Sequence, residues 1–343
     1  MFGWDPRAAR AAWTVALVAL ALYATFAVRK TLLIFILAVF LAYMIAPLVN
    51  LIDRHTPRRI PRGLSVLAAA LLVLGVLALG VALIAPSVAD QAQKLIEQLP
   101  TLTDPAKLVK KIPLPDWLES FRGRIEFFAA ENIKATIPFA RSAGLQVFSF
   151  AGNAIFLVLI PILAIIFVKD GALIRAALVR ELSPAASKAR VASILTDFDE
   201  ALGGYVRALG LLSLATLVAY GLFFSVVGVP YGILLAVIAA VFEIIPVFGP
   251  LVAALIALLV AGSAGYDHVL WIAGFILVYR IFQDYVLNPY LMRGNVGVHP
   301  ALVIFGLLAG EQLGGIAGIF LSIPVITGML ILDKHIRAKP QAS

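Results

Sequence analysis

Long, nearly uninterrupted apolar runs constrain the fold of this sequence more than any other feature. A helix needs about 20 apolar residues to cross the hydrocarbon core of a bilayer. Six runs reach that length within a few residues: 11–28, 31–49, 64–86, 143–168, 205–228 and 266–289. Two further runs, 231–262 and 299–332, are longer and are interrupted near their middles. We therefore predict an all-α polytopic membrane protein with six to eight membrane segments.

The composition of the 343-residue chain is typical of this class. Hydrophobic residues make up 62% and charged residues 13%, with a mean hydropathy of +1.02, whereas about a quarter of a soluble domain is charged. The net charge is +8, but Lys and Arg lie mostly in short segments between apolar runs, so we expect no nucleic-acid partner. Cysteine is absent and the histidines are scattered. We therefore expect no metal site, no cofactor and no enzymatic activity.

Positive charge sets the expected orientation, because cytoplasmic loops of membrane proteins are enriched in Lys and Arg. The arginine-rich segment 53–62 marks the cytoplasmic side. Two spans precede it, so the N-terminus is expected in the cytoplasm. The predicted units are three N-terminal spans (1–87), an extramembrane insert of amphipathic helices (88–142), a fourth span (143–168), a cytoplasmic helical segment (169–204), a transport core (205–333) and a cytoplasmic tail (334–343).

The two interrupted runs share a pattern that suggests a binding site. Glu243 is the only charged residue between Arg207 and Asp267, and it lies in the stretch F-E-I-I-P-V-F-G-P. In the other run Glu311 precedes Gly314 and Gly315. A helix broken at membrane depth leaves backbone groups unpaired, and these are tolerated only in protein or beside a wet cavity. A buried carboxylate needs the same surroundings. Paired broken segments are the best sequence indication of a transporter site.

Two topologies are compatible with these runs. If both are re-entrant hairpins, the chain crosses the membrane six times and loop 290–298 is cytoplasmic; if both are plain spans, it crosses eight times and that loop is external. Arg293 in this loop favours the hairpins. Glycines at every fourth position from 306 to 318 form a stripe of small residues suited to close helix packing.

The helix between the two runs carries Y-R-I-F-Q-D-Y-V-L-N-P at 279–289. Arg280 and Asp284 are four residues apart and can pair on one face. Arg280 is also the nearest predicted partner for either glutamate, unless it snorkels to the membrane surface. Asn288-Pro289 is expected to end or kink this helix. The candidate binding residues are Glu243, Pro246, Gly249, Pro250, Arg280, Gln283, Asp284, Asn288 and Glu311.

Several of these stretches resemble the autoinducer-2 exporter family of bacterial membrane proteins. They are E-I-I-P-V-F-G-P, Q-D-Y-V-L-N-P-Y-L-M-R-G-N-V-G-V-H-P and G-G-I-A-G-I-F-L-S-I-P. The resemblance covers nearly the whole chain and is most specific in the C-terminal half. It implies an oligomeric inner-membrane permease that exports a small signalling molecule, although some relatives are thought to be sodium/proton antiporters. The family usually continues its Y-[IV]-R motif with Gly-Gln, whereas Ala208 and Leu209 follow Arg207 here.

The leading hypothesis is a secondary transporter that moves a small polar solute by alternating access, with Glu243 binding a cation or a proton. The first alternative is a monovalent cation/proton antiporter that uses Na⁺ or Li⁺. The second is a membrane scaffold that does not transport, in which residues 88–142 recruit a partner. The expected partners are the lipid bilayer, a small polar solute, Na⁺ or H⁺, and further copies of the chain.

Overall fold

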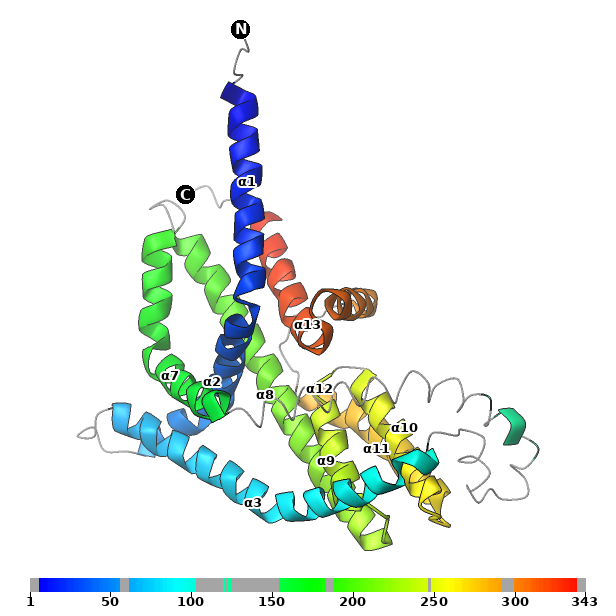
Figure 1. Cartoon of the computed structure of the whole chain (residues 1–343). Coiled ribbons are helices and arrows are strands. Elements are labelled where there is room, and N and C mark those ends of the chain that lie inside the picture. Colours follow the sequence, from blue (N-terminus) through cyan, green and yellow to red (C-terminus); the bar gives the residue numbers. More distant parts are fainter. Residues whose placement is uncertain are drawn as a thin grey trace.

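The computed structural model describes the protein as a set of helices (Figure 1). It describes residues 6–55, 62–102, 120, 122–124, 127, 154–182, 188–245, 248–291 and 299–337. All regular elements within these ranges are helical. Five helices are long and apolar enough to cross a membrane: Thr31–Ile52, Val66–Leu95, Lys188–Val227, Val269–Leu291 and Ala317–Arg337. The prediction of an all-α polytopic membrane protein is confirmed.

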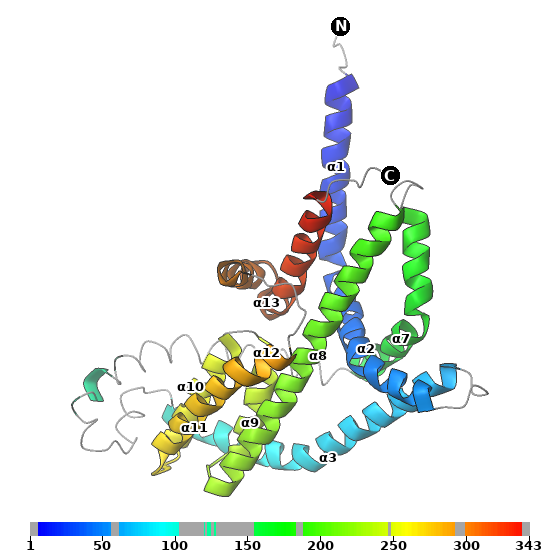
Figure 2. The ribbon, with the colours of Figure 1, turned by 180° about the vertical axis from the view of Figure 1, so that it is seen from behind.

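The first two helices, α1 (Pro6–Ala27) and α2 (Arg29–His55), form an almost continuous column (Figures 1 and 2). Helical hydrogen bonds cross the junction, from Val28 N to Ala24 O and from Leu32 N to Val28 O, both at 3.0 Å. The sequence predicted two successive spans separated at Arg29-Lys30, which would form an antiparallel pair. No glycine or proline lies at the junction, so nothing in the local sequence interrupts the helix.

The next two helices pack against α2. They are α3 (Arg62–Leu102) and α7 (Ala154–Leu182), and they share with α2 a cluster of small and branched apolar side chains. With 41 residues, α3 is about 60 Å long, twice the thickness of a bilayer core. Its far half reaches α9 (Gly232–Phe242), where Gln91 Oε1 accepts a hydrogen bond from Leu234 N at 2.9 Å. Most of the predicted insert of amphipathic helices (88–142) lies outside the described residues.

The 40-residue helix α8 (Lys188–Val227) runs through the centre of the molecule and contacts elements on several sides (Figure 2). Near its start, Asp199 accepts hydrogen bonds from Tyr43 of α2, at 2.5 Å, and from Arg175 of α7. Its second half packs closely against α9, and its aromatic rings contact those of α11 (Val269–Phe282). Phe223 and Phe275 stack with their centroids 4.0 Å apart. The main core therefore lies between α8 and the C-terminal half of the chain.

The first interrupted run folds into two short helices, α9 and α10 (Phe248–Ser263), which pack against each other. Their contact is lined by buried alanines, as expected where helices associate through close packing rather than through exclusion of water. Gly249 is required at the start of α10, because a Cβ there would overlap the carbonyl oxygen of Phe242. At 11 residues, α9 is about 16 Å long and too short to cross a bilayer core.

The second interrupted run also reverses direction, within α13 (Pro300–Arg337). Gly315 has φ 58° and ψ −137°, a conformation that strongly favours glycine, and it divides α13 into two arms. The arms pack face to face. A Cβ on Gly310 would overlap the backbone of Gly318, and a Cβ on Gly318 would overlap the backbone of Gly310. The glycine stripe thus provides close packing, as predicted, but between the two arms of one hairpin.

Candidate functional site

Glu243 lies at the C-terminal end of α9, where the chain turns towards α10. It is only 7% exposed, in a region whose other buried side chains are almost all apolar. A carboxylate in such a place is stable only if hydrogen bonds replace its lost hydration. The structure supplies those bonds from two other elements.

Both carboxylate oxygens of Glu243 have a donor. Gln283 Nε2 donates to Oε1 at 2.5 Å, and Thr216 Oγ1 of α8 donates to Oε2 at 3.2 Å. The Thr216 hydroxyl also lies 3.0 Å from the Tyr279 hydroxyl. The Thr216 hydroxyl has one hydrogen, which it donates to the carboxylate. The Tyr279 hydroxyl must therefore donate to Thr216 Oγ1. The result is a buried chain of hydrogen bonds from Tyr279 through Thr216 to Glu243.

Gln283 is brought into this network by a local change of helix type. It begins η2 (Gln283–Leu287), a π-helical turn between α11 and α12 (Asn288–Leu291), and it is 1% exposed. The Asn288 backbone N–H bonds to the Gln283 carbonyl, five residues back. Pro289 lacks an N–H and cannot continue the α-helical pattern, which accounts for the wider turn before it. The sequence predicted an end or a kink at Asn288-Pro289; instead the helix is deformed and continues to Leu291.

A cavity of about 210 Å³ opens beside the Glu243 carboxylate. Polar groups enter it from three sides, from α8, α9 and the α11–η2 helix, and the hydroxyl-bearing rings of two tyrosines form part of its wall. Apolar side chains of α10 and its neighbours close the rest. The lining residues are Thr216, Tyr220, Ala239, Glu243, Pro250, Leu251, Ala253, Ala254, Ile276, Tyr279, Arg280 and Gln283.

The predicted pair of Arg280 and Asp284 is present, with Arg280 Nε 2.9 Å from Asp284 Oδ2. Asn288 Nδ2 donates to the other oxygen of Asp284 at 3.1 Å. Arg280 also lines the cavity, but its ion pair is with Asp284 rather than with Glu243. Glu243 is therefore held by neutral donors, while the guanidinium and its partner carboxylate stay partly exposed at the edge.

The other predicted site residues are divided between the cavity and positions away from it. Pro250 lines the cavity and Gly249 permits the tight turn beside Glu243. Pro246 lies outside the described residues. Glu311 is exposed on the first arm of α13 and does not line the cavity. The structure therefore does not bring the two glutamates into one pocket, and a binding role for Glu311 stays a prediction.

Sequence reasoning did not single out Thr216, Tyr220 or Tyr279, although all three line the cavity. Two signals were available. Thr216 and Tyr220 are four residues apart on one face of an otherwise apolar helix, and Tyr279 is four residues before Gln283. These signals are weak by themselves, because isolated hydroxyl groups in apolar helices also bond to their own backbone.

Comparisons with known proteins agree with this architecture. The sequence profile described as AI-2E family transporter matches residues 14–337. A protein of Bacillus subtilis named "Putative transport protein YrrI" is 28% identical over 90% of this chain and 87% of its own length. A second Bacillus subtilis protein, YueF, with the same kind of name, is 25% identical over 87% of this chain and 84% of its own length. A Mycobacterium tuberculosis relative, MT0215, is 31% identical over 43% of this chain and 38% of its own length.

Proposed function

The chain belongs to the AI-2E transporter family and is a multi-pass membrane transporter, and on that premise we propose that it is a secondary transporter whose cavity at Glu243 binds a small polar solute. The observation that carries the proposal is a buried carboxylate at a helix break, held by donors from other helices and facing a cavity. This combination is what a solute site at membrane depth requires.

The site suits a solute that offers hydrogen-bond donors or a positive charge. An ionised carboxylate has about four lone-pair positions, of which the protein uses two. The remaining positions accept from a hydroxyl, an amine or a bound cation. Arg280 offers donors on the same wall for an acceptor at the other end of the solute. At about 210 Å³, the cavity has room for several waters or one small metabolite.

The two hairpins provide the proposed moving parts. Each has a first arm too short for a bilayer crossing, α9 with 11 residues and residues 300–314 of α13. We propose that both are re-entrant and enter the membrane from opposite sides. Movement of α9 and α10 relative to α8 would open the cavity to one side or the other, because Glu243 lies on the hairpin and Thr216 on α8.

The direct test is solute flux in proteoliposomes that contain Glu243→Gln. This change keeps the size of the side chain and removes its negative charge, so we expect flux to fall at least tenfold. Glu181→Gln is the matched control, because Glu181 is an exposed carboxylate on α7 paired with Arg180. Unchanged flux and unchanged pH dependence in Glu243→Gln would exclude this role for the carboxylate.

The second candidate function is monovalent cation/proton exchange at the same cavity. It is favoured by the oxygen atoms gathered there, namely the Glu243 carboxylate and the hydroxyls of Thr216 and Tyr279, since hard cations prefer oxygen ligands. Dye-quench measurements with Na⁺ or Li⁺ and no organic solute separate the two functions. Ion-driven proton movement that is lost in Glu243→Gln would favour exchange. A membrane scaffold predicts no transport signal and no effect of Glu243→Gln in either assay.

A further inference from the structure

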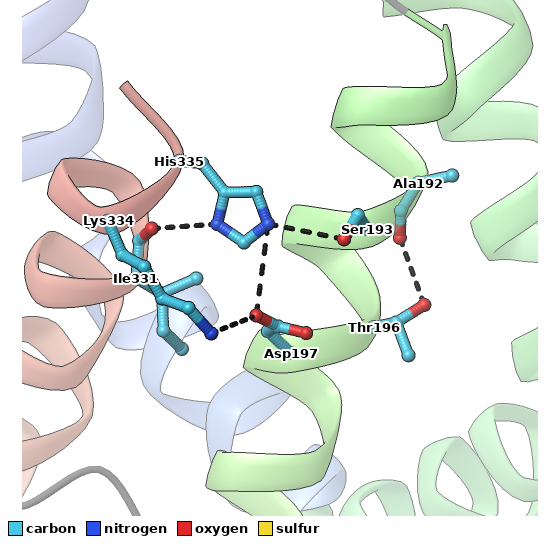
Figure 3. A network of polar contacts seen from close by, with 7 residues as sticks. All are labelled: Ala192, Ser193, Thr196, Asp197, Ile331, Lys334 and His335. Atoms are coloured by element: carbon cyan, nitrogen blue, oxygen red, sulfur yellow. Dashed lines mark hydrogen bonds and ion pairs between the residues drawn. The ribbon is translucent and has the colours of Figure 1, made fainter. Parts of the chain in front are cut away.

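The C-terminal end of α13 is joined to the start of α8 by a network of polar side chains (Figure 3). His335 lies between the two helices, with Nδ1 3.0 Å from the Ile331 carbonyl oxygen and Nε2 3.2 Å from Ser193 Oγ. Asp197 Oδ2 is 3.8 Å from the same Nε2 and 3.3 Å from Lys334 Nζ. The His335 side chain is only 14% exposed, so the packing of the two helices shields the ring, whereas Lys334 and Ser193 beside it are exposed.

The geometry fixes the tautomer of the neutral ring. A carbonyl oxygen only accepts, so Nδ1 of His335 carries the hydrogen that bonds to Ile331. Nε2 is then an acceptor, and the Ser193 hydroxyl donates to it. Protonation places a hydrogen on Nε2, which becomes a donor facing Asp197, and the Ser193 hydroxyl must turn to accept. The ring therefore has two bonding states within the same packing arrangement, and the proton selects between them.

Few charged groups face the imidazole. Asp197 approaches from α8 and Lys334 lies on the same helix as the ring (Figure 3). Asp333 and Arg337 pair with each other at 2.8 Å. Asp199, the next acidic residue of α8, bonds to groups on α2 and α7. Asp197 therefore interacts with one full positive charge when the ring is neutral and with two when it is protonated, which strengthens its attraction to α13.

In the part of the chain that the structure describes, the arm that ends at this junction also makes apolar contacts with its neighbours. Gly328 lies against Phe198, where a Cβ would be 3.0 Å from the ring, and Phe320 packs on Phe40 with centroids 4.6 Å apart. Among the described residues, the polar contacts between the last turns of α13 and α8 are those of His335 and Lys334 with Ser193 and Asp197. We propose that His335 is a proton-sensitive joint: protonation tightens the docking of α13 on α8, and deprotonation loosens it.

The experiment measures the distance between the two helices and does not depend on transport. Because the chain has no cysteine, Ala189→Cys on α8 and Leu332→Cys on α13, both exposed, can carry spin labels for pulsed electron resonance in nanodiscs. We expect the ratio of docked to undocked molecules to rise about 1.4- to fivefold, the factor that corresponds to about 0.2–1 kcal/mol for a partly exposed ion pair, when the pH falls from about 8 to about 5.5, across the histidine range.

Three variants separate this joint from a general effect of pH. His335→Gln removes the titrating ring and should abolish the response, whereas His299→Gln should keep it, because His299 lies at the start of the other arm and caps Ala301 N. Ser193→Ala removes the hydroxyl that bonds to Nε2 in both states of the ring but leaves Asp197 in place, so it should loosen docking at both pH values and keep the pH response. The proposal would be overturned if the pH response survived in His335→Gln, or if the distance between the labels in the parent chain did not change with pH.

Discussion

At the scale of single residues, Thr216 shows how hydrogen bonds stabilise a buried carboxylate. Its hydroxyl donates to Glu243 and accepts from Tyr279, so one small side chain satisfies a group on α9 and another on α11. Gln283 supplies the second donor from the π-helical turn. Because each donor comes from a different helix, the carboxylate also holds the relative positions of those helices. The same contacts would change when a proton, a cation or a solute binds Glu243.

Removing the Thr216 hydroxyl should affect both stability and flux. Thr216→Val keeps the shape of the side chain but leaves Glu243 Oε2 and the Tyr279 hydroxyl without their partner. A buried polar group left unpaired costs about 1–3 kcal/mol, so we expect a lower melting temperature in detergent and reduced flux. Thr216→Ser keeps the hydroxyl and is the matched control. Equal melting temperatures for the two variants would contradict the importance of this bond.

At the scale of elements, glycine decides where the second hairpin can form. The two arms of α13 touch through Gly310 and Gly318, where any side chain would overlap the opposite backbone. Gly314, one turn away on the same sequence stripe, has no atom within 4 Å of the position that a Cβ would take. The stripe therefore contains glycines with different roles, and the regular spacing in the sequence does not distinguish them.

The same substitution at these two glycines should have opposite effects. Gly318→Ala forces the arms apart, and such overpacking costs about 1–3 kcal/mol. Gly314→Ala meets open space and removes a poor helix former, which stabilises a helix by up to about 1 kcal/mol. Thermal unfolding followed by tryptophan fluorescence should give a lower melting temperature for the first variant and an equal or higher one for the second. A similar loss in both would mean that the arms do not pack as described.

At the scale of the whole molecule, α8 connects regions that lie far apart. Its first turns carry Asp197 and Asp199, which bond to α13 and to α2 and α7, and its second half carries Thr216 to the cavity. Thr216 is 19 residues beyond Asp197, which is about 28 Å along a helix. The cavity is thus built on a helix whose other end is fixed by polar contacts, which would support the proposed movement of the hairpins against it.

The membrane topology can be tested with two single cysteines. If both hairpins are re-entrant, a cysteine at Asn295 and one at Ser343 should react with an impermeant thiol reagent from the same side of the membrane. If both interrupted runs are plain spans, the two positions should react from opposite sides. The absence of native cysteine makes the background low. The comparison does not require knowing which face of the vesicles points outward, because it needs only the same majority orientation in both preparations.

The sequence by itself determined the fold class and named four of the residues that line the cavity, Glu243, Pro250, Arg280 and Gln283. Apolar runs of bilayer length require helices, and a lone glutamate beside glycine and proline in such a run requires polar surroundings. Spacing also predicted the pair of Arg280 and Asp284, because residues four apart on a helix share a face whatever surrounds them. These are local properties, and they hold in any tertiary arrangement of the chain.

Only the tertiary structure decided which polar groups meet. Thr216 and Gln283 reach Glu243 across 27 and 40 residues of sequence, and Tyr279 reaches it through Thr216. Glu311, which the sequence also offered as a candidate, lies exposed outside the cavity. Helix packing sets these distances, and packing depends on small residues at particular positions, such as Gly249 against Phe242. A single sequence shows that such residues are present but does not show which backbone each of them approaches.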